Sequence, residues 1–111
     1  AGELKHGTIS LITPGVPVVA LLSVSALAEK TVSGIREVTA RGGEVLALAS
    51  PSVIHSTPIP AAHLLQIPEL PEPFSLFPAT TLLQLLAYHI SARMGLDVDK
   101  PRNLAKSVTV E

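Results

Sequence analysis

Cysteine is absent from this chain of 111 residues, and so is tryptophan. Without cysteine the chain can hold no disulfide framework, no thiolate zinc site and no cysteine nucleophile. Aromatic residues are scarce, at 3%, although 47% of all residues are hydrophobic. A chain of this length forms one domain at most. Leucine, valine, isoleucine and alanine must therefore fill its interior.

An excess of charge is also lacking, because the formal net charge is −1 at pH 7. A nearly neutral chain has no basic field with which to bind nucleic acid non-specifically. No apolar run reaches the roughly 20 residues that span a bilayer, and no signal segment, basic and then apolar, opens the chain. We therefore expect a cytoplasmic protein with neither nucleic-acid nor membrane partners.

Metal and nucleotide motifs are missing too. The sequence contains no HExxH motif, no nucleotide-binding glycine pattern and no carboxylate pair on one helix face. Asp97 and Asp99 flank Val98, but a hard cation needs several oxygen ligands and no third ligand is nearby. The sequence therefore predicts neither a metal site nor a cofactor.

Two continuous apolar runs predict the centre of a sheet. Pro17–Leu22 (PVVALL) and Glu44–Ser50 (EVLALAS) are typical of buried parallel strands. Between them we expect a helix that Ser25 caps, that ends near Ala40 and that Gly42 closes. Its inward stripe, at steps of three or four residues, comprises Ala28, Val32, Ile35 and Val38. A strand, a helix and a second strand then form a parallel crossover unit.

The segments outside this unit carry weaker patterns. Thr8–Ile12 is expected to be a short extended piece, and residues 51–61, with three prolines, a surface loop. His63–Ile67 is the third predicted strand. These strands and helices predict an α/β fold, a three-layer sandwich with a mostly parallel sheet that is incomplete in this chain.

A long helix is predicted from about Ser75 to Met94, with Gly95 as its cap. Pro78 is tolerable only if it lies in the first turn. From residue 82 to residue 90 the helix is apolar on nearly every side. We therefore expect it to be packed on several sides.

Three motifs, in order along the chain, resemble one family. AGELKHG (1–7), LLQLLAYHISARMG (82–95) and DVDKPRNLAKSVTVE (97–111) resemble segments of the glutamine–fructose-6-phosphate aminotransferases and cover about a third of the chain. The resemblance implies a flavodoxin-like SIS (sugar isomerase) fold. It divides the chain into residues 1–96, the C-terminal part of an SIS domain, and residues 97–111, a tail that closes over the sugar site.

The same resemblance implies the site residues. Lys106 aligns with the lysine that forms a Schiff base with the open-chain ketose, and the backbone at Ala105 contacts the substrate. His6 aligns with the histidine that assists opening of the sugar ring across a dimer interface. On composition alone Lys106 would be a solvated terminal charge. Thr8 departs from the family pattern, which commonly has proline there. The other histidines, His55, His63 and His89, are interpreted as structural.

The function that the resemblance implies belongs to a longer enzyme. That enzyme converts fructose 6-phosphate, with ammonia from glutamine, into glucosamine 6-phosphate as a homodimer. Its glutaminase domain and its first SIS domain would be partners of this chain. The family's phosphate-binding loop and proton-moving glutamate do not occur in this sequence, so we expect the isolated chain to be inactive. Two alternatives are a non-catalytic phosphosugar-binding SIS module and a structural dimerisation fragment.

Overall fold

The computed structural model of the chain describes residues 2–100. The chain divides into two compact units, Ala1–Ala79 and Thr80–Glu111. The first unit contains the three strands, the shorter helices and the first residues of the long helix. The second contains most of the long helix and the loop that follows it.

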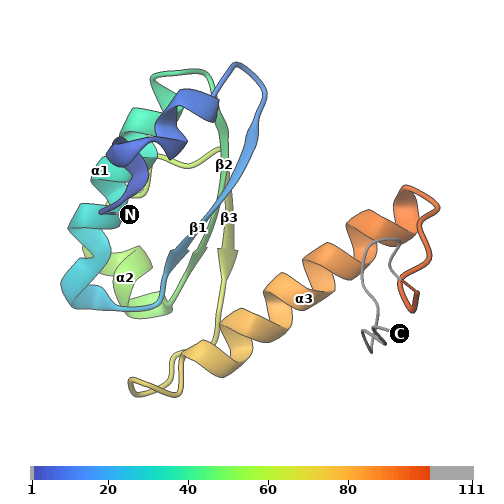
Figure 1. Ribbon diagram of the computed structural model, residues 1–111. Coiled ribbons are helices and arrows are strands. Elements are labelled where there is room, and N and C mark those ends of the chain that lie inside the picture. Colours follow the sequence, from blue (N-terminus) through green and yellow to red (C-terminus); the bar gives the residue numbers. More distant parts are fainter. Residues whose placement is uncertain (1, 101–111) are drawn as a thin grey trace, which may run out of the picture. The chain divides into compact units, whose positions relative to one another are not determined.

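The first unit is built on a parallel sheet of three strands, ordered β1-β2-β3 (Figure 1). The strands are β1 (Pro17–Leu22), β2 (Glu44–Ala49) and β3 (His63–Gln66). Pro17 is paired with Glu44 across the first ladder, and Leu46 with His63 across the second. All three predicted strands, and their parallel direction, are therefore confirmed.

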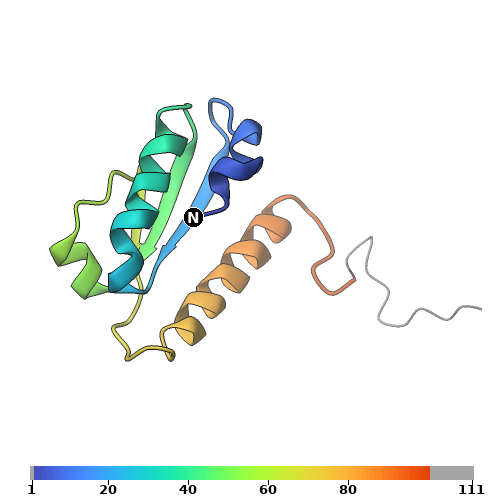
Figure 2. The same cartoon turned by 60° about the vertical axis from the view of Figure 1, so that its left-hand side comes forward.

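The helix α1 (Ala28–Thr39) connects β1 to β2 and packs on one face of the sheet (Figure 2). The predicted inward stripe is confirmed, since its four residues are the buried residues of α1: Ala28, Val32, Ile35 and Val38. They pack against the alternate strand residues that point to this face, such as Leu22 and Val45. Burying a side chain of this size contributes about 1.5–3 kcal/mol.

The start of α1 differs from the prediction, and its end agrees. Ser25 does not cap α1; it opens a short 3-10 turn, η3 (Ser25–Leu27), in which Leu27 N–H bonds to Val24 O at 3.1 Å. This tighter turn leads directly into α1, so the cap position falls on Leu27, which has no side-chain hydrogen bond. Gly42 follows the helix with φ 80°, as predicted for a left-handed closing glycine.

A second short helix occupies part of the predicted loop at 51–61. This helix, α2 (Pro51–Ser56), begins at a proline, whose fixed φ and missing N–H suit the first helical position. Val53 is completely buried and belongs to the same core cluster as α1. His55 therefore lies on a helix, with Nδ1 2.6 Å from Pro51 O, and not in a loop. The loop prediction was wrong because this core contact cannot be seen in the local sequence.

The N-terminal segment also differs from the prediction. It forms two 3-10 turns, η1 (Leu4–His6) and η2 (Thr8–Leu11), where Thr8–Ile12 was expected to be extended. Local hydrogen bonds explain the difference: the N–H and the hydroxyl of Ser10 both donate to Gly7 O, at 3.0 and 2.7 Å.

The long helix α3 (Leu76–Arg93) begins and ends close to the predicted residues. Pro78 lies in its first turn, where a proline is tolerated. Gly95 has φ 70°, and the N–H of Leu96 bonds to Ser91 O at 3.0 Å, which closes the helix. Within residues 2–100, no helix has the combined length and apolar character that crossing a bilayer requires.

The expected burial of α3 is wrong for the part of the chain that the structure describes. Leu85 is 46% exposed and Ile90 is 50% exposed, while Leu82 and Leu86 are half-buried. The apolar sequence indicated that these side chains are covered, but the described residues do not supply the cover.

Candidate functional site

The first predicted site residue, His6, ends the 3-10 turn η1. Its N–H bonds to Glu3 O at 3.0 Å, and its side chain is exposed. Gly7 follows with φ 146°, a conformation that side-chain-bearing residues rarely adopt. The chain therefore changes direction directly after His6, which leaves the imidazole at the surface of the first unit.

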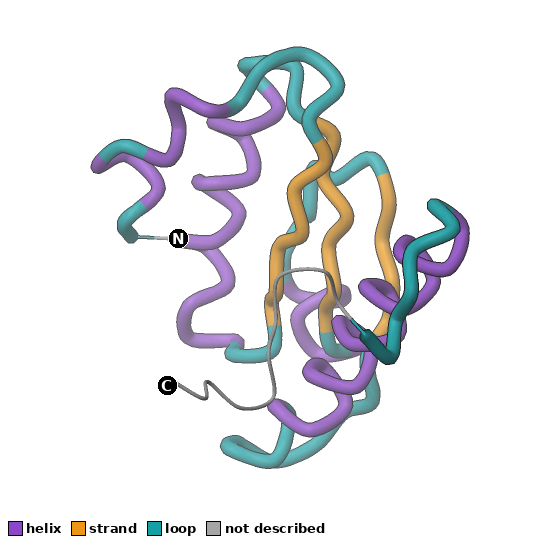
Figure 3. Tube along the Cα trace, turned by 45° about the vertical axis from the view of Figure 1, so that its right-hand side comes forward, coloured by secondary structure: helices purple, strands orange, loops and turns teal. Residues whose placement is uncertain are grey.

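The turn that carries His6 is fastened to α1 and the core. Leu4 is partly buried and packs against the core cluster. Lys5 Nζ lies 2.8 Å from Glu37 Oε1 on α1. Figures 1 and 3 show this N-terminal segment beside α1. His6 thus follows Leu4, which packs on the core, and Lys5, which forms the ion pair, and it precedes the turn at Gly7. These neighbours give the exposed side chain a defined position.

A mostly aliphatic cavity of about 420 Å³ lies between the N-terminal turns, β1 and α1. Its polar lining is limited to Glu3, Thr8 and Thr31; the rest of the lining consists of Leu4, Val18, Val19, Ala20, Leu21, Gly34, Ile35, Val38 and Val45. In the described part of the chain β1 has a strand neighbour on one side only. The cavity therefore offers a surface for packing and contains no arrangement of acids and bases.

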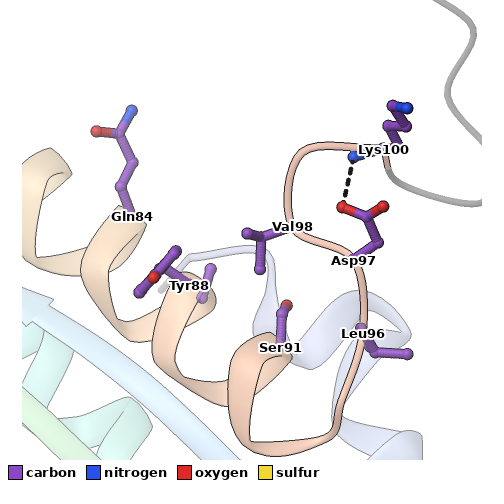
Figure 4. Close-up of a pocket in the computed structure, with 8 residues that line it drawn as sticks. Gln84, Tyr88, Ser91, Leu96, Asp97, Val98 and Lys100 are labelled. Carbon is purple, nitrogen blue, oxygen red and sulfur yellow. Dashed lines mark hydrogen bonds between the residues drawn. The ribbon is translucent and has the colours of Figure 1, made fainter.

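The second unit has its own pocket, of about 480 Å³, where the loop after α3 turns back along the helix (Figure 4). The helix contributes Gln84, Ala87, Tyr88 and Ser91 to its lining, and the loop contributes Leu96, Asp97, Val98 and Lys100. In Figure 4 Val98 faces the helix. The pocket combines an apolar wall with hydroxyl, amide and charged groups.

Asp97 shapes this loop. Its Oδ1 accepts a hydrogen bond from the backbone N–H of Asp99, at 3.0 Å. It accepts a second from the backbone N–H of Lys100, at 3.1 Å, which Figure 4 shows. This is the usual way in which an aspartate closes a tight turn. Among residues 2–100, no group of three or more histidine or carboxylate side chains could hold a metal ion. The carboxylate of Asp97 instead binds the backbone of its own loop.

The tail with the other predicted site residues continues from this loop. Lys106 and Ala105 lie outside the described residues, so their assignment stays a prediction. The other histidines are placed on α2 (His55), at the start of β3 (His63) and on α3 (His89). The His89 ring lies edge-on to Tyr88, with ring centroids 5.3 Å apart.

Sequence reasoning missed one residue near His6. Glu37 is not part of the predicted inward stripe of the helix, yet its side chain is only 24% exposed and forms the ion pair with Lys5. No local pattern could have shown this, because the two residues are joined by tertiary structure. The opposite charges of Lys5 and Glu37 were the only sign of this ion pair in the sequence.

The fold has a close counterpart among solved structures. It matches the C-terminal domain of glucosamine-fructose-6-phosphate aminotransferase from Francisella tularensis with a TM-score of 0.81 and 34% sequence identity, over 90% of this chain and 28% of that chain. No family model matches the chain. The structural match and the parallel α/β sheet identify the fold as that of a sugar isomerase domain, as predicted.

Sequence comparison is more specific. Over the whole chain, glutamine–fructose-6-phosphate aminotransferases are 47% identical in Brucella abortus biovar 1, 49% identical in Thermus thermophilus and 54% identical in Symbiobacterium thermophilum. Over its whole length the chain is similar to the enzymes of this family. It spans 18% of the length of each of these relatives.

Proposed function

We propose that this chain is the C-terminal part of the isomerase module of an enzyme that makes glucosamine 6-phosphate. The substrates would be fructose 6-phosphate and ammonia released from glutamine. The observation that carries the proposal is the similarity of the whole chain to relatives of that name, at 44–54% identity. The match to the C-terminal domain of a solved relative supports the same position in the longer protein.

Lys106 would be the nucleophile in this reaction. Its neutral amine attacks the carbonyl carbon of the open-chain ketose, and loss of water leaves an imine that withdraws electrons from the neighbouring carbon. Burial or a nearby cation would favour the neutral amine. Ala105 would contact the sugar through its backbone, since its small side chain permits close approach. The terminal motif that contains both residues supports these roles.

His6 would transfer the proton that accompanies opening of the sugar ring. A histidine suits this step because imidazole gains and loses a proton near neutral pH. Its exposed position on an anchored turn leaves it accessible to a substrate that another part of the enzyme holds. In this proposal His6 serves the site of the second subunit in a homodimer.

The remaining parts of the reaction would come from the rest of the longer enzyme. A glutaminase domain would release ammonia, and the first SIS domain would bind the phosphate. The glutamate that moves the proton between sugar carbons would precede residue 1. Residues 97–111 would form the closing tail and residues 1–96 the domain beneath it. We also propose a cytoplasmic location. On its own the chain should therefore produce no glucosamine 6-phosphate.

Chemical trapping tests the proposal. The longer enzyme is incubated with fructose 6-phosphate and borohydride, which reduces an imine to a stable amine, and the labelled peptide is then mapped. We expect the sugar on Lys106 and not on Lys100 or Lys5. The same incubation with sorbitol 6-phosphate, which has no carbonyl group, is the control. Covalent label on a different lysine, or no label at all, would contradict the proposed Schiff base.

A further inference from the structure

An ion pair joins the turn that carries His6 to α1. Lys5, the direct neighbour of His6, places Nζ 2.8 Å from Glu37 Oε1. Among residues 2–100 this is the single ion pair. Isolated ion pairs on an exposed surface contribute little to stability, so its position beside a proposed site residue is the more informative property.

A cavity between the turn and α1 shows that the ion pair connects two segments that are not otherwise packed together at this point. A cavity of about 280 Å³ lies between the turn and α1, lined by Gly2, Lys5, Lys30, Ser33, Gly34 and Glu37. Apolar side chains therefore do not fill the gap between the two segments at this point. The ion pair spans the gap, and Leu4 packs against the core. The turn is thus held to the folded unit at two neighbouring points, by the apolar contact of Leu4 and by the ion pair of Lys5.

Glu37 is the fixed member of this pair. Its side chain is 24% exposed, compared with 67% for Lys5. It lies on α1 next to the buried Val38. In addition, Arg41 Nη1 donates to Glu37 O at 3.0 Å, which fastens the end of the helix. The carboxylate of Glu37 is thus held in place by a helix that packs on the sheet. The more exposed side chain of Lys5 takes its position from that carboxylate.

We propose that Glu37 is a positioning residue for His6. Acting through Lys5, it sets the orientation of the turn and so the direction in which the imidazole meets the sugar ring. The inference rests on the proposed function, in which His6 assists ring opening. Glu37 itself does not touch the substrate.

Substitutions in the longer enzyme test this role. Glu37→Gln keeps the shape of the side chain and removes its charge; Glu29→Gln, on the same helix and outside the ion pair, is its control. Lys5→Gln is compared with Lys30→Gln, because Lys30 lines the same cavity and forms no ion pair with any of residues 2–100. We expect Glu37→Gln and Lys5→Gln to lower kcat with fructose 6-phosphate about two- to fivefold. The controls should match the wild type, and the charge swap Lys5→Glu with Glu37→Lys should restore most of the rate.

A substrate that needs no ring opening separates positioning from general damage. 5-Deoxyfructose 6-phosphate lacks the hydroxyl that closes the ring and stays open-chain. We expect Glu37→Gln and wild type to use it at equal rates, and His6→Ala to show a much smaller defect with it than with fructose 6-phosphate. If Glu37→Gln slows both substrates equally, Glu37 is merely structural and the inference is wrong.

The two hypotheses fail in different ways. If His6→Ala lowers the rate with fructose 6-phosphate by about 10²-fold, as expected for loss of acid–base assistance, but Glu37→Gln behaves like Glu29→Gln, only the positioning inference is overturned. If His6→Ala has no effect, the proposed role of His6 fails, and the role of Glu37 fails with it. Trapping of the sugar on Lys106 tests the rest of the proposed function independently.

Discussion

Glu69 holds Ser52 by two hydrogen bonds, from the backbone N–H to Oε2 at 2.8 Å and from the hydroxyl to Oε1 at 2.9 Å. Ser52 lies in the first turn of α2, directly after β2, and Glu69 follows β3. The carboxyl ends of parallel strands meet at one edge of a sheet, so two segments distant in sequence come together there. The carboxylate supplies an acceptor and a favourable charge where helix N–H groups are unpaired.

Removing this carboxylate should loosen α2. We expect Glu69→Ala to lower the local opening free energy of α2 by about 1 kcal/mol, the usual cost of a lost helix cap. Hydrogen exchange of the α2 amides in the longer enzyme should then be about fivefold faster. Glu72→Ala is the control, because Glu72 lies in the same segment between β3 and α3. Unchanged α2 exchange in Glu69→Ala would show that the carboxylate does not hold the helix.

The core beneath α1 should respond strongly to truncation. Leu22 is 1% exposed and packs in the cluster beneath α1. We expect Leu22→Ala to cost about 2–5 kcal/mol, because transfer free energy is lost and a cavity is left. Leu11→Ala is the matched control, since Leu11 is 72% exposed. Thermal unfolding of the longer enzyme should show a lower Tm only for Leu22→Ala; equal effects would place Leu22 outside the core.

Leu85 on α3 tests whether the apolar surface of this helix is covered in the longer enzyme. The chain spans only 18% of its relatives, and Leu85 is 46% exposed within it. If further protein covers the helix, Leu85→Ala costs about 2–5 kcal/mol. That is the outcome that we expect from unfolding of the longer enzyme. A change within about ±0.5 kcal/mol, typical of surface sites, would contradict it.

Lys106 carries the proposed chemistry, and Lys106→Arg separates charge from nucleophilicity. Arginine keeps the positive charge but stays protonated, so it cannot attack a carbonyl carbon. We expect the variant to lose formation of glucosamine 6-phosphate while glutamine hydrolysis in the other domain largely survives. Both rates are measured on the same preparation. Near wild-type synthesis would show that the lysine acts only as a charge, and Lys100→Arg serves as the control.

Local patterns in the sequence were enough to determine the crossover unit. The strands β1 and β2 and the buried stripe of α1 agree with the prediction because an unbroken apolar run and a period of 3.6 residues can both be read from consecutive residues. The closing glycines Gly42 and Gly95 were predictable for the same reason, since their positive φ values depend on the absence of a side chain. The motifs at both ends of the chain also pointed to the family of the relatives to which the whole chain is similar.

Tertiary structure alone decided the features that depend on partners distant in sequence. The helix α2 replaces a predicted loop because Val53 reaches the core and Glu69 holds Ser52. Similarly, the orientation of the His6 turn depends on Glu37, which lies on another element. Such contacts have no period and no fixed spacing, and they form only after the sheet has brought the segments together. The resemblance in the sequence therefore predicts a role for His6, whereas the ion pair that Glu37 forms with the turn became visible only in the folded chain.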